Sequence, residues 1–272
     1  AARPESEHRV ALAESGCLAP HWPAPYGRGA GPAEQLLIQE ELAAAGITRP
    51  DLVIGWWAVP TVLEHGTAEQ IERFAMPTLR GDIVWCQLFS EPGAGSDLAA
   101  LRTTAEKVDG GWTLQGQKVW TSLAHEADWA ICLARTDRDA PKHKGITYFL
   151  VDMKSAGITV APLREITGDA LFNEVFLDSV FVPDECVVGS LGGGWKLART
   201  RSRTSGSRWA GNRRSAPQSK NSSPRLHPAT RWPTTGSVLR SARRWSVRCW
   251  TCAPLSRSSR VRIPARRRAC GS

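Results

Sequence analysis

The last quarter of the sequence has no acidic residues. Residues 199–272 contain none of the 26 Asp and Glu but 19 of the 35 Lys and Arg. The first 198 residues therefore hold 16 basic and 26 acidic residues, a net charge of −10 within a chain whose formal charge is +9. The high overall pI therefore reflects the last quarter of the chain and not the first 198 residues. This uneven charge distribution indicates that two unlike polypeptides are joined.

Long apolar runs and a secretion signal are also absent. No stretch approaches the roughly 18 consecutive apolar residues that span a bilayer. The start of the chain lacks the charged, apolar and small-residue segments of a signal peptide. We therefore expect a cytoplasmic protein with no membrane partner.

Paired metal ligands are missing as well. The seven cysteines are scattered, and four of them lie among apolar or strand-like residues, which predicts reduced and mostly buried thiols. Cys249 and Cys252 have the C-x-x-C spacing, but no second pair and no His partner lies near them. The sequence predicts no metal site and no redox role for this pair.

A dinucleotide-binding fingerprint is incomplete. The stretch from Gly93 to Leu98 lacks the third glycine of G-x-G-x-x-G, Pro92 precedes it, and no amphipathic helix follows. A Rossmann nicotinamide site is therefore not expected.

Residues 1–82 contain helical patterns. Ile38, Leu42 and Ala45 recur at helical spacing, and Gly46 follows them, which predicts a core-facing helix that ends there.

A second helix is expected after Thr67, because Thr67-Ala-Glu-Gln70 has the sequence of a capping box. Its predicted core residues are Ile71, Phe74 and Ala75, and Pro77 is expected to end or bend it. His65 precedes this cap and has no evident partner, so we interpret it as a structural residue and not as a base.

From Asp82 onward the apolar period changes to about two. Asp109-Gly-Gly111 predicts a hairpin. The other predicted strands are short and rich in Val, Ile, Phe and Thr, and they cover residues 128–134, 145–152, 158–162 and 174–182. Such spacing is typical of a small barrel or sandwich, so the predicted fold class is α+β.

Two stretches of this β region predict one wall of a flavin site. The run from Gln87 to Asp97 ends a strand and turns through Pro92, Gly93 and Gly95, which exposes backbone amides beside hydroxyl and carboxylate groups. The later run from Gln117 to Ser122 offers an indole and two hydroxyls. An isoalloxazine ring needs both a flat apolar face and short hydrogen-bonding groups.

In these motifs and in the run Gly168–Val175, the chain resembles the acyl-CoA dehydrogenase family over residues 11–198. The resemblance implies FAD as cofactor, an amino-terminal helical domain (1–82, with the first helix missing because no initiating Met is present), and a middle β domain (83–190). A carboxy-terminal four-helix domain would follow, and we assign residues 191–272 to the start of its first helix and then to an anomalous tail rich in Arg, Ser and Trp.

The resemblance also implies roles for individual residues. The flavin-binding residues would be Leu88, Phe89, Ser90, Gly95, Ser96, Trp120, Thr121 and Ser122. The substrate-binding residues would be Ser96, Asp169, Phe172 and Asn173. Glu91 belongs to the motif without being the proton acceptor, and the role of His125 stays open between a loop residue and a substrate contact.

The reaction implied is α,β-desaturation of an acyl-CoA thioester, with electrons leaving through an electron-transferring flavoprotein. The run from Lys142 to Met153 is similar to actinobacterial members, some of which act on branched or steroid-derived thioesters. The family's catalytic Glu lies in the carboxy-terminal domain, so no catalytic residue is expected in this chain. The family forms oligomers, which are doubtful for this chain.

Residues 199–272 do not continue the family pattern. Arg and Ser dominate, and no helical or strand period is present from Arg199 onward. Read one base out of frame with GC-rich codons, Arg201–Ala210 becomes LANERVAMG, which resembles the family's first carboxy-terminal helix. We interpret the segment as a frame-shifted translation that leaves the enzyme inactive. The alternatives are a disordered basic tail that binds nucleic acid, which is the less favoured, and a non-catalytic partner subunit of the same fold.

Overall fold

The computed structural model describes residues 5–204 apart from residues 167 and 169. They belong to the first of two compact units in the chain, Ala1–Gln218. The expected basic tail lies outside the described residues from 205 onward, as do Cys249 and Cys252.

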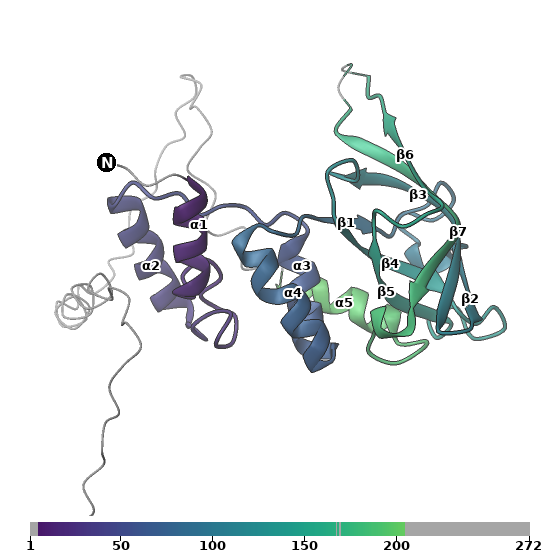
Figure 1. The fold of residues 1–272 in the computed structure, drawn as a ribbon, viewed down its shortest axis with the longest axis horizontal. Helices are drawn as coiled ribbons and strands as arrows, with labels where there is room; N and C mark the ends of the chain where they lie inside the picture. The colour runs from purple at the N-terminus through teal and green to yellow at the C-terminus, as the bar shows by residue number, and fades with distance from the viewer. Residues whose placement is uncertain (1–4, 167, 169, 205–272) are drawn as a thin grey trace, which may run out of the picture. The chain divides into compact units, whose positions relative to one another are not determined.

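Four α-helices come first in this part of the chain, the strands follow, and helix α5 comes last (Figure 1). The helices are α1 (Glu5–Glu14), α2 (Pro32–Ala44), α3 (Gly55–His65), α4 (Ala68–Arg80) and α5 (Gly194–Thr204), with short 3₁₀ helices η1 (Leu98–Ala100) and η2 (Asp184–Cys186). The strands are β1 (Trp85–Leu88), β2 (Thr104–Val108), β3 (Gly111–Ser122), β4 (Trp129–Arg135), β5 (Ile146–Asp152), β6 (Ile158–Leu163), β7 (Phe172–Pro183) and β8 (Val187–Val188). The predicted α+β class is confirmed for these residues.

Helix α4 begins at the predicted capping box. Thr67 Oγ1 accepts from the Gln70 N–H at 3.3 Å, and Gln70 Oε1 accepts from the Thr67 N–H at 3.1 Å. Phe74 and Ala75 are buried as predicted. Pro77 does not end the helix, which continues to Arg80 and stops at a left-handed Gly81. A proline near the last turn removes only one hydrogen bond, and packing of the buried face compensates for it.

Helix α2 was expected to face the core, and this is wrong. None of its residues is buried, and Leu36 is 59% exposed. Leu42 only packs against the edge of a small cluster formed by α1, α3 and α4. The apolar spacing identified the helix, but spacing cannot say whether another element covers its face.

The eight strands form one sheet in the order β6-β7-β3-β2-β4-β5-β8, and β1 pairs with β4 in parallel. Figure 1 shows the strands curling around a common interior. The predicted hairpin is confirmed, since Val108 pairs with Gly111 and Gly110 has a φ of 70°. The four other predicted strands are also confirmed, as β4, β5, β6 and β7.

The interior of the sheet continues into helices α3 and α4. Phe74 of α4 packs edge-on against Trp85 and Trp129, with ring centroids 5.4 and 4.8 Å away. Gln70 adds a polar link, because its Nε2 donates to the carbonyls of Glu185 and Val187 at 2.6 and 2.8 Å. The helices and the sheet therefore share one core.

Helix α5 corrects the prediction that no helix is present from Arg199 onward, because it continues to Thr204. It contacts α3 and β5, and Leu197 is buried. Once Gly194–Ala198 has formed a packed first turn, each further residue extends the helix at little free-energy cost.

The cysteines of the described residues are free thiols, as predicted. Cys86, Cys132 and Cys186 are buried, and burial raises the pKa of the Cys132 and Cys186 thiols to about 11.

None of the helices within residues 5–204 combines the length and apolarity needed to cross a membrane.

Candidate functional site

The first predicted motif begins inside the core. Leu88 and Phe89 are buried, and the Phe89 ring lies edge-on to Tyr148 with centroids 6.1 Å apart. Their side chains are therefore core residues, and only their backbone could face a ligand. The carbonyl of Phe89 already accepts from Lys118 Nζ at 3.3 Å.

The chain then turns into solvent. Glu91 and Ala94 exchange two backbone hydrogen bonds of 3.0 Å, which closes the turn through Pro92 and Gly93. Gly95 and Ser96 follow on the exposed surface. The predicted amide-rich turn is thus present and accessible.

The second predicted motif ends strand β3 with a bulge. The register with β7 shifts between Lys118 and Thr121, and Trp120 lies inside the bulge with a φ of 58°. Positive φ is rare for a bulky residue, and such backbone conformations cluster at functional sites. The bulge leaves the Trp120 indole 62% exposed, with Phe172 edge-on at 5.8 Å.

Thr121 and Ser122 pair directly with the start of β7. Thr121 lies opposite Asn173 and Ser122 opposite Phe172. Asn173 is buried, and its Nδ2 donates to the Thr121 carbonyl at 3.0 Å. The structure therefore brings together four residues predicted separately from two stretches.

The Thr121 side chain is buried without a partner. It is 1% exposed, and its Oγ1 makes no hydrogen bond within the described residues. A buried hydroxyl that lacks a partner is destabilising by about 1–3 kcal/mol. Such an atom is expected where a ligand supplies the missing bond.

His125 lies near this group. Its Nδ1 is 3.4 Å from Asn173 Nδ2, and its Nε2 is 3.3 Å from Glu126 Oε1. The imidazole is about half exposed, with 51% of its side chain accessible. Asp169, the other predicted substrate residue, lies outside the described residues.

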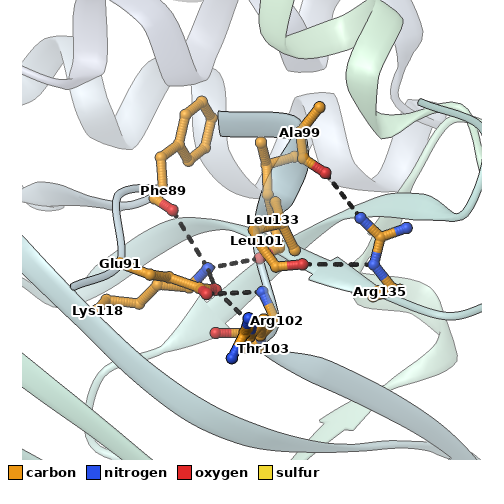
Figure 2. A network of polar contacts seen from close by, with 9 residues as sticks. All are labelled: Phe89, Glu91, Ala99, Leu101, Arg102, Thr103, Lys118, Leu133 and Arg135. Atoms are coloured by element: carbon orange, nitrogen blue, oxygen red, sulfur yellow. Dashed lines mark hydrogen bonds and ion pairs between the residues drawn. The ribbon is translucent and has the colours of Figure 1, made fainter. Parts of the chain in front are cut away.

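The two motifs meet at a buried ion pair that the sequence did not predict (Figure 2). Lys118 Nζ lies 2.9 Å from Glu91 Oε1 and donates to the Leu133 carbonyl at 2.8 Å. The Glu91 carboxylate also accepts from the N–H groups of Arg102 and Thr103 at 2.6 and 2.9 Å. No spacing rule connects a Lys and a Glu 27 residues apart.

The surroundings of Glu91 keep it ionised. Burial alone would raise the pKa of this carboxyl, but the Lys118 charge and the hydrogen bonds from Thr103 and Arg102 outweigh burial, so the pKa lies below its usual value. An ionised carboxylate with all its oxygens engaged is a poor proton acceptor. We therefore keep the prediction that Glu91 belongs to the motif without being the proton acceptor.

Comparison with known proteins identifies the two domains that carry these residues. Residues 3–82 match the acyl-CoA dehydrogenase N-terminal domain, and residues 86–180 match the acyl-CoA dehydrogenase middle domain. Over 200 residues the chain is 74% identical to acyl-CoA dehydrogenase FadE34 of Mycobacterium tuberculosis. The aligned residues make up 74% of this chain and 28% of that protein.

Two solved structures extend the comparison to the fold. The Tcur3481-Tcur3483 steroid ACAD superposes with a TM-score of 0.65 at 34% identity, covering 77% of this chain and 54% of that one. The ChsE4-ChsE5 complex from Mycobacterium tuberculosis gives a TM-score of 0.61 at 35% identity, covering 74% and 52%. The chain thus spans about half the length of these solved relatives and less of FadE34. Through its helical and middle β domains, the chain belongs to the acyl-CoA dehydrogenase family.

Proposed function

We propose that this chain carries the flavin-binding wall of an FAD-dependent acyl-CoA dehydrogenase. The observation that carries the proposal is the buried, unpartnered hydroxyl of Thr121 beside the exposed indole of Trp120. A ring system with a flat apolar face and hydrogen-bonding edges fits that pair of groups.

Individual residues would hold FAD in distinct ways. The Trp120 face would cover the isoalloxazine, and the Thr121 and Ser122 hydroxyls would bond to its polar edge. The exposed amides around Gly95, with the Ser96 hydroxyl, would bind phosphate. Bound FAD supplies the two-electron acceptor for desaturation between the α and β carbons of an acyl-CoA.

The proton-abstracting base would come from elsewhere. Within the described residues, Glu91 is the acidic side chain buried beside the bulge, and Lys118 holds it ionised. Family resemblance places the base in the carboxy-terminal domain, which the acid-free segment after residue 198 does not supply. We therefore infer that residues 199–272 are translated out of frame and that the chain alone does not desaturate substrate.

A second candidate function is that of a non-catalytic partner subunit. Two observations favour it: both solved relatives are named as pairs of polypeptides, and Glu91, the buried acid beside the bulge, is already held by Lys118. A partner chain would then supply the base. The steroid substrate named for one relative suggests a bulky, steroid-derived acyl-CoA in preference to a short straight chain.

Titration of FAD into the purified 272-residue chain tests the proposal, with flavin fluorescence and near-UV circular dichroism as readouts. We expect saturable binding of FAD and no comparable binding of NAD. An absence of saturable FAD binding would contradict the flavin wall. The second experiment mixes this chain with a candidate partner chain and measures desaturation of a steroid-derived and a butyryl thioester. Desaturation that requires both chains would support the partner-subunit function, and its absence would support the chain without a base.

A further inference from the structure

We propose that Glu91 and Lys118 are positioning residues, and that their ion pair fixes the loop of residues 91–103 against the bulge of β3. This inference rests on the proposed function, because Gly95 and Ser96 on that loop would bind FAD phosphate. Neither residue is assigned to touch the cofactor. They act through the backbone that they hold.

The pair closes the neck of the loop. The loop begins at Glu91 after β1 and ends just before β2 at Arg102 and Thr103, whose N–H groups both donate to the Glu91 carboxylate. One side chain therefore joins the two ends of the loop. Figure 2 shows this carboxylate between the two returning amides and the Lys118 ammonium.

Lys118 joins the neck to the rest of the site. Its Nζ donates to the carbonyls of Phe89, which directly follows β1, and of Leu133 on β4, in addition to Glu91. The next residue, Val119, donates its N–H to the Ser90 carbonyl at 2.9 Å. The strand segment that holds the neck is thus the one that bulges to expose Trp120.

Stability alone does not account for a pair in this place. Lys118 is 0% exposed and Glu91 7%, and removing two charges from water costs about as much as their attraction returns. Apolar residues of similar size would often serve equally well. What the pair adds is one fixed geometry for three backbone segments at once.

Arg135 holds the far side of the same loop. Its Nη2 donates to the Ala99 carbonyl at 2.8 Å and its Nε to the Leu101 carbonyl at 3.3 Å. Figure 2 shows these bonds beside the ion pair. The loop is therefore anchored at η1 independently, so losing the ion pair should release the neck without unfolding the sheet.

The test compares the full chain with the double variant Glu91→Gln/Lys118→Met, which leaves no buried charge and keeps an acceptor at position 91. A matched control is Lys107→Met, which breaks an exposed pair between Lys107 of β2 and Asp184 of η2. Hydrogen exchange of the Arg102, Thr103 and Val119 amides is measured without cofactor, and FAD affinity and the visible spectrum of bound FAD are measured separately.

We expect the double variant to melt as a folded protein while these amides exchange at least about tenfold faster, because a charge-assisted acceptor is lost. FAD affinity should fall by about the same factor, since the phosphate-binding turn is no longer held in one conformation. The visible spectrum of bound FAD should also shift. Lys107→Met should change none of these. Wild-type exchange in the double variant would overturn the proposal, and so would faster exchange with unchanged FAD affinity and spectrum. If the wild-type chain binds no FAD, the proposed function fails, and the exchange rates still decide whether the pair holds the loop.

Discussion

The N–H of Val119 donates to the carbonyl of Ser90 across 2.9 Å, and this bond joins two stretches that are separate in sequence. Ser90 begins the turn that leads to Ser96, and Val119 begins the bulge that exposes Trp120. The two halves of the proposed flavin wall are therefore linked through the backbone.

Removing the exposed indole should weaken FAD binding without weakening the fold. Trp120 is 62% exposed, so Trp120→Ala loses little core packing. We expect the FAD dissociation constant to rise about tenfold, as a lost stacking surface implies. The control is Phe181→Ala, which truncates an exposed aromatic side chain on the neighbouring strand β7 and should leave FAD affinity unchanged. Equal losses in both variants would contradict a specific role for Trp120.

Thr121→Val should affect stability and binding in opposite directions. Without FAD the substitution removes an unpartnered buried hydroxyl, so the free energy of unfolding should stay equal or rise by up to about 1 kcal/mol. FAD affinity should fall. Thr61 is the matched control, because its equally buried Oγ1 donates to the Trp57 carbonyl at 2.8 Å. Thr61→Val should lose about 1 kcal/mol of stability and keep FAD affinity.

The ion pair should give the chain an acid-sensitive step. The folded pKa of Glu91 lies below the ordinary value of 4.5. Its contribution to stability is therefore complete above about pH 4.5 and is lost as the pH falls through the folded pKa. Glu91→Gln should be less stable than the wild type by about 3–5 kcal/mol at neutral pH. Urea unfolding across this range should show the difference shrinking below pH 4.5, and a pH-independent difference would contradict the assignment.

The capping box of α4 should stabilise the helical domain by a measurable amount. Thr67→Ala removes the acceptor for the Gln70 N–H and should cost about 1 kcal/mol in the free energy of unfolding. Thr67→Ser keeps an equivalent hydroxyl and should cost little. The comparison fails if both variants unfold at the same denaturant concentration.

The nucleotide sequence gives an independent check on the tail. If residues 199–272 are out of frame, the gene should differ from its relatives by one inserted or deleted base within codons 195–205. Sequencing that region decides the point. An intact frame with unrelated third-base usage would favour a genuine basic segment instead.

Local patterns predicted the fold best where the stabilising contacts are local. The capping box at Thr67 and the hairpin at Asp109 and Gly110 each depend on residues within one turn, and both were confirmed. The strands of the β domain followed from another local pattern, short runs rich in Val, Ile, Phe and Thr. The burial of α2 was predicted wrongly, because it depends on which distant element covers the helix.

The candidate site shows the same division. The motif residues Trp120, Thr121 and Ser122 could be named from sequence, and the structure places them beside Phe172 and Asn173. The bulge that turns Trp120 outward and the ion pair beneath it could not be named, since both depend on pairing between β3 and distant segments. The available signal for the ion pair was Lys118, a single Lys within a run of otherwise uncharged residues in β3.

The most direct test of the account is anaerobic reduction of FAD by an acyl-CoA, measured as loss of flavin absorbance. Two chains are compared: the 272-residue chain, and one in which the residues after 198 are translated in the shifted frame. We predict that both bind FAD and that only the second is reduced, with the matching enoyl-CoA as product. Reduction of the 272-residue chain alone at ordinary enzyme rates, about 1–1000 per second, would contradict the claim that it carries the flavin wall without the base.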